Sequence, residues 1–528
     1  MAGSSFNGGV QFKSPRRVVV RFLLRSRERA TGKLRKLREG YDRAQREIQK
    51  LIRQCAATQA AAGEAAAQVR RLEGEQWARW REAEWILPPD PPVGPHGYGA
   101  RMVELSVRLA QAVGFRPAVR VMEIFFAWLG VKQRVPHETA IRNWLQRLGV
   151  AVINEPLEQA NDWVWMADHS NQIGQEKILV VLAVRASQLP PPGTALRLED
   201  MRTLAVRPGK CWKREDVARA YAELAAVHGV PRQILSDGAV ELRDSAAVLK
   251  TQRSDCITLQ DFKHKAANFL ETTLGENPRF SEFTAQVGRT RAAIQQTELA
   301  HLTPPGLKTK ARFMNLGTLL KWGQTVLWLL DHPEAKSRQG LTDCRLESKL
   351  GWLREFVADL AAWNECQQVI QRGLEFVNTQ GVSTGASDRL RVISMEGLSH
   401  SLGRDMAERL IAFVKAAEDQ LKAGERLPLS TEILESSFAR YKQLEGQHAK
   451  GGFTSLVAAF AGLLLNPTPS TIKAKFSRVS TKHVQQWLHE NLDQTVTSKR
   501  VTTYREMKQA TKPNRTQVQR ATKTTTTS

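Results

Sequence analysis

Two aspartates stand directly after apolar runs that are typical of buried strands. Asp168 ends the segment "WVWMAD" and Asp237 ends "RQILSD". In open α/β sheets functional sites lie outside the carboxyl ends of the strands, so the two carboxylates converge if their strands are neighbours. A charge on the strand face that carries Val164 and Met166 is costly unless a cation compensates it, and Mg²⁺ commonly binds one or two carboxylates. The alternative is that each Asp only starts a turn, as Asp237 before Gly238 readily would.

A third acid is expected from elsewhere in the chain. The candidates are Glu432, Glu435, Glu241, Asp244 and Asp261. Glu435 stands out because Lys442 follows two helical turns later on the same face, and Arg440 belongs to the same helix. The acid would then bind a metal while the cation steadies a phosphate. An ordinary solvated helix face is the alternative.

The segments around these acids predict a mixed α/β sheet. Between 163 and 261, three consecutive strand-like runs are followed by alternating helix and strand, which favours parallel pairing of the later strands. From about 276 to 428 the strand signals vanish, and the pattern is helical throughout. The helix that carries Glu435 comes next, with Ser430 or Thr431 as its N-cap.

Residues 100–150 predict a helix-turn-helix. A helix, a turn marked by Gly130 and a second helix would present Thr139, Arg142 and Asn143 where a recognition helix meets base edges. Plain helical packing is the alternative, because short three-helix units are common.

An apolar seam runs from Leu34 to Leu72 in alternating steps of three and four residues. This spacing predicts a coiled coil over 31–86, and hence a homodimer or higher homo-oligomer. An intramolecular helical hairpin is the alternative. A proline- and glycine-rich linker, 87–99, separates this segment from the helix-turn-helix.

The charge balance points to a polyanionic partner. Lys and Arg number 77 against 53 Asp and Glu, which gives a net charge of +24 in a chain of 528 residues. Nucleic acid is therefore the first candidate partner. The longest apolar stretch, 453–465, is too short to cross a bilayer, so no membrane partner is expected. The five cysteines form no CxxC pair and there is no GxxxxGK[ST] loop, so neither a zinc finger nor a nucleotide cofactor is expected.

The order of these blocks resembles the DDE transposases of bacterial insertion sequences, within the RNase-H-like (retroviral-integrase) superfamily. In that fold the first strand supplies one Asp, the fourth strand a second Asp and a late helix the Glu. Here "WVWMADHS", "QILSDGAVEL" and "TEILESSFARYK" match those blocks. The long interval before Glu435 resembles members that insert a helical domain ahead of the Glu helix.

Glu435 and Lys442 also match the E-(6)-K half of a signature found in some of these transposases. The Tyr and Arg that precede the Glu in that signature are absent, and Thr431 stands four residues before Glu435. Glu432 therefore remains an alternative third acid.

The resemblance implies a transposase that cleaves transposon ends and transfers the 3′-hydroxyl strand into target DNA. Asp168, Asp237 and Glu435 would be its catalytic residues and the ligands of two Mg²⁺ or Mn²⁺ ions. The implied partner is double-stranded DNA, contacted by the helix-turn-helix and by Arg440 and Lys442, and the implied location is the nucleoid in bacterial cytoplasm.

Asp261 and His264 lie just past another strand end and are accessory candidates. His264 either contacts the scissile phosphate or only caps local structure. Two rival functions remain open: an RNase-H-like nuclease or resolvase that cuts without joining, and a catalytically silent DNA-binding regulator derived from a transposase.

The expected fold is an α/β RNase-H-like core with a large all-helical insertion, preceded by a coiled coil and a helix-turn-helix. The expected segments are a basic N-terminal segment (1–30), the coiled coil (31–86), the linker (87–99), the helix-turn-helix (100–150), the first part of the core (160–275), the helical insertion (276–428), the Glu-bearing part of the core (429–466), and a basic region with a disordered tail (467–528).

Overall fold

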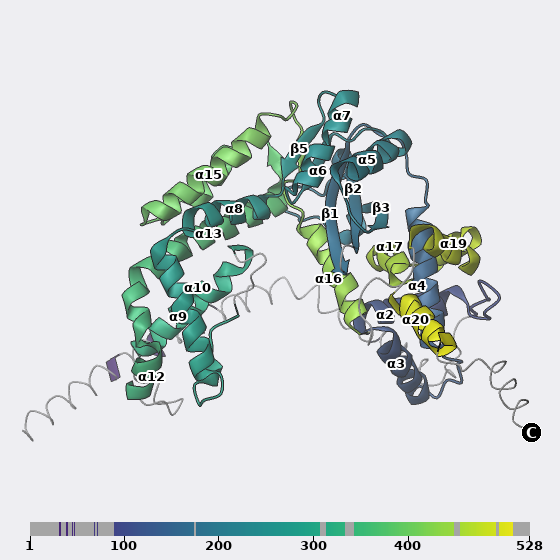
Figure 1. The fold of residues 1–528 in the computed structure, drawn as a ribbon, viewed down its shortest axis with the longest axis horizontal. Coiled ribbons are helices and arrows are strands. Elements are labelled where there is room, and N and C mark those ends of the chain that lie inside the picture. The colour runs from purple at the N-terminus through teal and green to yellow at the C-terminus, as the bar shows by residue number, and fades with distance from the viewer. Residues whose placement is uncertain are drawn as a thin grey trace, which may run out of the picture. The chain divides into compact units, whose positions relative to one another are not determined.

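The computed structural model describes residues 89–173, 176–306, 313–332, 343–447, 455–492 and 496–510, with isolated positions between 31 and 71. The chain divides into two compact units, one formed by Met1–Pro88 with Leu129–Val131 and the other by Pro89–Trp128 with Lys132–Ser528. The expected basic segment 1–30 and almost all of the expected coiled coil 31–86 lie outside the described residues, as does the tail 511–528. The second unit contains the sheet and its helices (Figure 1).

The second unit is built on a five-stranded mixed sheet with strand order β3-β2-β1-β4-β5. The strands are β1 (Trp163–Ile173), β2 (Glu176–Arg185), β3 (Arg202–Gly209), β4 (Gln233–Ser236) and β5 (Ile257–Gln260). The first three pair antiparallel, whereas β4 is parallel to β1 and β5 is parallel to β4. Parallel neighbours need long connections, which helices supply before β4 and β5. The predicted mixed sheet with parallel later strands is confirmed.

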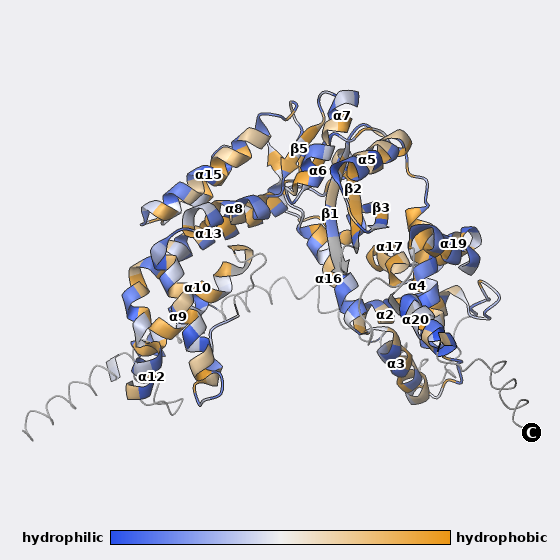
Figure 2. Ribbon diagram, in the orientation of Figure 1, coloured by the Kyte–Doolittle hydropathy of each residue, from blue (hydrophilic) through white to orange (hydrophobic). Residues whose placement is uncertain are grey.

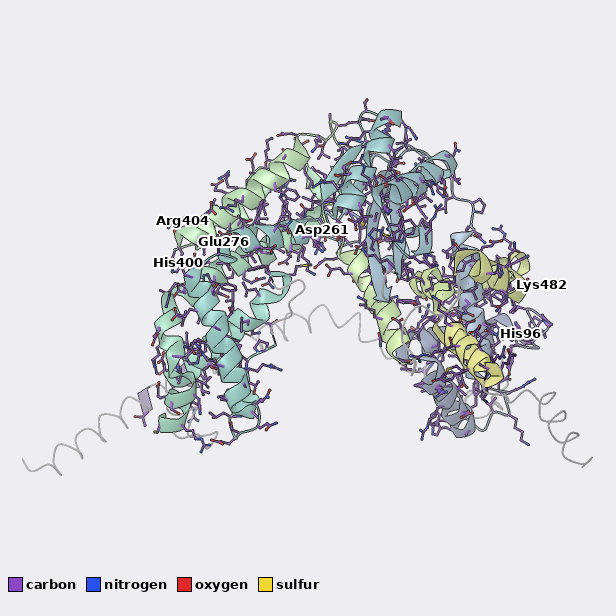
Figure 3. All side chains as sticks on the ribbon, in the orientation of Figure 1. His96, Asp261, Glu276, His400, Arg404 and Lys482 are labelled. Carbon is purple, nitrogen blue, oxygen red and sulfur yellow. The ribbon has the colours of Figure 1, made fainter. Side chains whose placement is uncertain are left out.

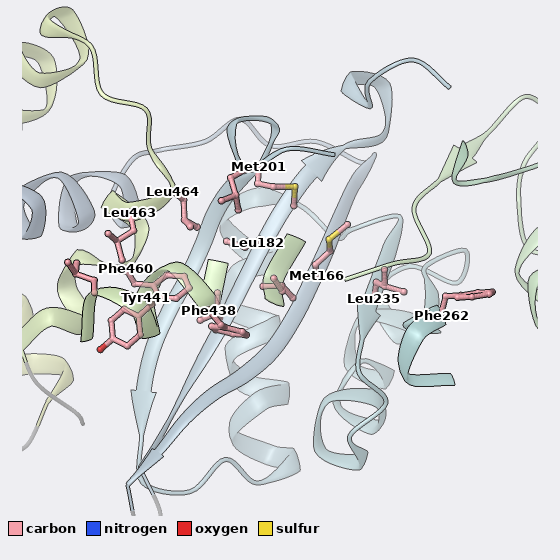
Figure 4. Close-up of a cluster of buried hydrophobic side chains, with 14 of the residues drawn as sticks. Met166, Leu182, Met201, Leu235, Phe262, Phe438, Tyr441, Phe460, Leu463 and Leu464 are labelled. Atoms are coloured by element: carbon pink, nitrogen blue, oxygen red, sulfur yellow. The ribbon is translucent and has the colours of Figure 1, made fainter. Parts of the chain in front are cut away.

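The helices around the sheet explain why both faces of β1 are apolar. They are α5 (Arg214–His228), α6 (Val240–Ser245), α7 (Ala247–Gln252), α8 (Phe262–Leu274) and α16 (Glu432–Gly446). On one face Trp165 packs on Tyr221 of α5, with ring centroids 6.2 Å apart. On the other, Met166 belongs to a buried cluster with Phe438 and Tyr441 of α16 (Figure 4). Burial on both sides accounts for this composition, and the neighbouring β2 is drawn as hydrophobic in Figure 2.

The region from 276 to 428 is mainly helical, as predicted. Its helices are α9 (Pro278–Ile294), α10 (Leu316–Leu330), α12 (Asp343–Leu350), α13 (Val357–Gln380), α14 (Ala386–Met395) and α15 (Ser401–Glu418). Aromatic rings form part of its core, and Trp363 lies 5.2 Å from Phe280 and 5.3 Å from Phe283 between centroids. Trp363 is buried, but Trp328, another tryptophan of this region, is exposed.

The expectation of an all-helical insertion is wrong in one detail. Strand β6 (Val382–Ser383) pairs antiparallel with β7 (Arg426–Leu427). Gly381 ends α13 with a φ of 65°, a conformation that favours glycine, and so turns the chain into β6. Strands of two residues are too short to show an alternating pattern, so the sequence contains no signal for them.

The start of β4 binds the segment that returns from this helical region. Arg232 is buried, and its Nε and Nη2 donate to the two carboxylate oxygens of Glu425 at 2.7 Å. Gln233 donates to the carbonyl oxygen of Pro428 at 2.9 Å. These bonds attach the segment before α16 to the start of β4. The helix that carries Glu435 and the strand that precedes Asp237 are therefore joined near their first residues.

Helices from both ends of the chain pack together beside the sheet. They are α2 (Ala100–Val113), α3 (Phe115–Trp128), α4 (Glu138–Ile153), the 3₁₀ helix η6 (Ser455–Ala459), α17 (Phe460–Leu464), α18 (Pro469–Arg478) and α19 (Thr481–Asn491), followed by α20 (Val496–Ala510). Helix α4 contacts η6, α17, α18 and α19. A Cβ on Gly149 would lie 2.0 Å from the carbonyl oxygen of Ala458, so this close approach requires glycine.

The helices α18 to α20 occupy part of the C-terminal region for which the sequence indicated only basic composition. Their apolar positions are few, but Ile472, Phe476 and Trp487 are buried. Among the described residues, no helix has the length and apolarity that crossing a bilayer requires.

Candidate active site

Asp168 and Asp237 lie side by side at the point where two parallel strands stop pairing. The register of β1 and β4 runs from Val164 opposite Gln233 to Ala167 opposite Ser236. The next residue on each strand is an aspartate. The convergence of the two acids, predicted from the ends of their strands, follows directly from this register.

The expectation that the first strand ends at Asp168 is wrong. Strand β1 continues to Ile173, because the residues after Asp168 keep their antiparallel pairing with β2; Asp168 itself faces Val180. What stops at Ala167 is only the parallel pairing with β4. Asp168 is therefore held within a hairpin rather than at a free strand end, which limits the motion of its carboxylate.

The charge of Asp168 is poorly compensated. Burial and the nearby charge of Asp237 raise the pKa of Asp168 to about 7, and Glu435 contributes in the same direction. The His169 amide, which donates to Oδ1 at 2.6 Å, and the positive charge of His264 act against this rise. Because Asp237 and Glu435 both raise the pKa of Asp168, each of them lies within electrostatic reach of that carboxylate.

Asp237 both starts a turn and faces the other acids. Its Oδ1 accepts the Ala239 amide at 2.8 Å, and Gly238 has a φ of 92°. Gln260 of β5 donates to the Asp237 carbonyl oxygen at 3.0 Å, and its side chain fills the space where a Cβ on Gly238 would lie. The turn therefore fixes the position of the Asp237 carboxylate. Asp237 can start a turn and also belong to the candidate site, so the two alternatives stated for it are compatible.

Both leading candidates for the third acid, Glu432 and Glu435, lie in the first turn of α16. Glu435 accepts a hydrogen bond from Nζ of Lys263 at 2.6 Å, and both side chains are partly exposed. Glu432, the alternative third acid, accepts a hydrogen bond from Asn378 of α13 and lies 3.5 Å from the same ammonium group. Of these two acids, Glu435 is the one that raises the pKa of Asp168.

Asp261 joins the end of β5 to the start of α16. Its Oδ1 accepts the Thr431 amide at 2.6 Å, and the Phe262 amide donates to the Leu429 carbonyl at 3.0 Å. Its other oxygen, Oδ2, caps α8 by accepting the His264 amide at 2.9 Å. Asp261 is buried at the junction of α8 with the sheet (Figure 3), so its role in the structure is to orient other groups.

His264 is held by the same carboxylate. Its Nδ1 lies 2.8 Å from Asp261 Oδ2. Burial lowers the pKa of His264, but the hydrogen bond and charge of Asp261, together with Asp237 and Asp168, raise it overall. The imidazole is therefore fixed locally, as one alternative predicted, and also contributes positive charge beside the two aspartates.

The remaining acidic candidates lie near other charged or titratable side chains. Glu241 is 3.8 Å from both His169 Nδ1 and Lys177 Nζ, while Asp244 pairs with Arg243 at 2.9 Å. The five DNA-binding candidates all reach solvent: of the three on α4, Thr139 is exposed and the other two are partly buried, and the two on α16 are exposed. These residues are Thr139, Arg142 and Asn143 on α4, and Arg440 and Lys442 on α16.

Sequence reasoning missed three side chains near the acids. Lys263 lies between Asp261 and His264 in "DFKH", and only that position hinted at a role. His169 is largely buried, stacks on Trp212 at 6.0 Å, and its Nε2 has no hydrogen-bond partner among the described residues. The Tyr221 hydroxyl is also buried and has no hydrogen-bond partner among the described residues. Burial is the main cause of its raised pKa, and the negative charges of Asp237 and Asp168 add to it.

The donor chemistry of this site fits a hard divalent cation. Asp168 and Asp237 offer carboxylate oxygens, and the raised pKa of Asp168 marks negative charge that lacks a counter-ion. Within the described ranges, no three His, Cys, Asp or Glu side chains are arranged to hold a metal ion together. Glu435 is hydrogen-bonded to Lys263, so a complete set of three ligands requires that this carboxylate turn to the aspartates.

No protein-family model matches the chain, and no curated protein matches its sequence. Among solved structures, the chain is similar to one described as "Drosophila P element transposase strand transfer complex", with 9% sequence identity and a TM-score of 0.36. The similarity covers 71% of this chain and 93% of that one. Similarity at this level does not identify a family or a function.

Proposed function

We propose that the chain is a DDE-type DNA transposase of the kind carried by bacterial insertion sequences, with an RNase-H-like core. The observation that carries the proposal is the convergence of Asp168 and Asp237 where the parallel pairing of β1 and β4 ends, with Glu435 of α16 close enough to raise the pKa of Asp168. The order of these elements, first strand, fourth strand and a late helix beyond a helical region, is the order that the resemblance implies.

Asp168, Asp237 and Glu435 would hold Mg²⁺ or Mn²⁺, with two ions expected per site. When bound, such ions supply a nucleophile of low pKa and stabilise the charge on the leaving oxygen. Asp168 is fixed by strand pairing and by the His169 amide, and Asp237 by its turn. His264, oriented by Asp261, is placed to donate a hydrogen bond to an anionic oxygen beside the two aspartates.

Double-stranded DNA is the proposed partner, because the net charge of +24 favours a polyanion. Thr139, which is exposed in the first turn of α4, would contact base edges, while Arg440 and Lys442 of α16 would contact phosphates. A homodimer or higher homo-oligomer, joined through the expected coiled coil, would process both element ends.

The test is to incubate the full chain with DNA carrying its element ends and either Mg²⁺ or Mn²⁺. Nicked ends and joined 3′-hydroxyl products are the expected result. Nicking without joining would favour the nuclease or resolvase, and DNA binding without either product would favour the silent regulator. Because joining needs the 3′-hydroxyl that nicking exposes, pre-cleaved ends are the matched control: an end that carries a 3′-hydroxyl should be joined, and the same end terminated by a 3′-dideoxynucleotide should not.

A further inference from the structure

Lys263 belongs to α8 and contacts the first turn of α16, the helix that carries Glu435. It lies in the first turn of α8, two residues after Asp261, which is hydrogen-bonded to the start of α16. This short separation in sequence keeps Lys263 opposite the first turn of α16. Its ammonium group therefore meets the acids of that turn because of the backbone arrangement, not through a chance surface encounter.

The ammonium group makes two contacts of unequal strength. It donates to Glu435 Oε2 at 2.6 Å and lies 3.5 Å from Glu432 Oε1. Charge-assisted hydrogen bonds of the shorter length are the stronger kind. Glu432 is in turn bonded to Asn378 of α13, so a chain of polar contacts runs from the helical region through Glu432 and Lys263 to Glu435.

A cation bound by the two aspartates would compete with Lys263 for Glu435. Both are positive, and both bind carboxylate oxygens. Without Lys263, three acids would face one another with their charges compensated mainly by His264. With Lys263, Glu435 is neutralised, but it cannot serve as a metal ligand through the same oxygen while the ammonium group holds it.

We propose that Lys263 is a positioning residue that holds Glu435 in the metal-free protein and gives it up when a divalent cation binds beside Asp168 and Asp237. This inference rests on the proposed function. The ammonium group that is released remains on the first turn of α8, next to His264, where it can pair with Glu432 or with a phosphate.

Mn²⁺ binding to the full chain without DNA tests the proposal, measured by titration calorimetry at pH 8. We expect Lys263→Met to bind Mn²⁺ about fivefold more tightly than the wild type, because the competitor for Glu435 is gone. Lys263→Arg keeps the ion pair and should stay near the wild-type affinity. Unchanged affinity in Lys263→Met would overturn the proposal.

Loss of any nearby positive charge favours a bound cation, so a matched control is needed. Lys177→Met removes an ammonium group that lies near His169 and Glu241 and does not touch Glu435, and it should change Mn²⁺ affinity less than about twofold. In a Glu435→Gln background, Lys263→Met should have no larger effect than Lys177→Met. An equal gain in both backgrounds would also overturn the proposal.

Thermal unfolding in EDTA gives a second readout that needs neither metal nor DNA. Lys263→Met should lower the unfolding midpoint and Lys263→Arg should restore it, because only the ion pair differs. If Lys263→Met does not fold, Lys263→Gln takes its place in the same double-mutant cycle. Absence of Mn²⁺ binding by the wild type would overturn the proposed function and this inference together, whereas DNA cleavage with no effect of Lys263 would overturn this inference alone.

Discussion

Two regions differ in whether core packing explains their residue types: the edge of the sheet that carries Asp168 and Asp237, and helix α4. Asp168 is held against Asp237 at an energetic cost, and its pKa is raised to about 7. In α4, by contrast, the positions from Trp144 to Ala151 are buried against η6 and helices α17 to α19. Core packing accounts for most of α4, but nothing in the packing requires two neighbouring carboxylates.

The difference separates a signal of function from a signal of folding. A fold selected only for stability would place a neutral or apolar side chain at position 168, because like charges repel and burial penalises both. The buried positions of α4 from Trp144 onward satisfy the requirements of a core helix, so only the positions before Trp144 are left for the proposed DNA binding. Changes at the two regions should therefore affect different measurements.

The largest effect is expected for Asp168→Asn and Asp237→Asn. Each removes a carboxylate oxygen that would hold the metal, so strand cleavage of end DNA should fall by at least about 1,000-fold while the protein stays folded. The measurement is nicking of a labelled duplex in Mg²⁺, with circular dichroism as the folding check. Asp244→Asn is the control, since Asp244 pairs with Arg243 at the surface. Full activity in Asp168→Asn would remove the distinction between the two regions.

The sequence predicted the features of the core that depend on local pattern. Doubly buried strands are continuously apolar, and both aspartates follow such runs, so their meeting could be predicted from the expected parallel pairing. The extension of β1 beyond Asp168 was missed because "HSNQI" is polar and pairs only with β2. Its strand conformation depends on the hairpin partner rather than on its own composition.

Contacts between residues far apart in sequence could not be predicted. Nothing in the sequence distinguishes Lys263 from other lysines, because its contact with Glu435 depends on the way Asp261 joins α8 to α16. The buried pair of Arg232 with Glu425 likewise joins two segments whose sequences share no pattern. The choice of Glu435 over Glu432 likewise depends on which side of α16 faces the aspartates. The sequence could indicate both acids but not the rotation of their helix.

The next largest effect is expected for Asp261→Ala, which would show how far the sheet edge depends on its support. It removes the acceptor for the Thr431 amide, the His264 amide and the His264 ring. We expect a loss of about 3 kcal/mol in the free energy of unfolding, because buried donors are left unpaired. Urea denaturation measures it.

Asp261→Asn is the informative companion to that variant, since its side-chain oxygen can still accept the Thr431 amide. It should lose less stability than Asp261→Ala. If both variants lose the same amount, or neither loses more than a surface change such as Asp244→Ala, Asp261 does not join α8 to α16.

A smaller effect is expected from pH, and it sharpens the contrast in stability. The pKa of Asp168 is about 7 in the folded protein against 3.8 for an ordinary Asp. Between these values the folded state keeps a proton that the unfolded chain releases, so the free energy of unfolding falls as pH rises from about 4 to 7. Urea denaturation in EDTA should show this fall.

His264, whose pKa is raised from 6.5, adds its own fall in stability as pH rises above about 6.5, so the comparison is between wild type and Asp168→Asn. The variant should have a shallower dependence and should be more stable than wild type at pH 8. Parallel curves for the two proteins would mean that the Asp168 charge is compensated in the fold.

The smallest effect is expected on α4. Arg142→Ala with Asn143→Ala should weaken binding to the element ends about tenfold and leave binding to unrelated DNA nearly unchanged, since base contacts carry discrimination while phosphate contacts do not. Fluorescence anisotropy at two salt concentrations measures both. Arg120→Ala, which removes an exposed charge from α3, is the control and should weaken both DNAs slightly and equally. If the double variant of α4 weakens binding to both DNAs equally, α4 contributes only charge and packing. Of the two regions compared, only the one that carries Asp168 and Asp237 would then have residues that packing does not explain.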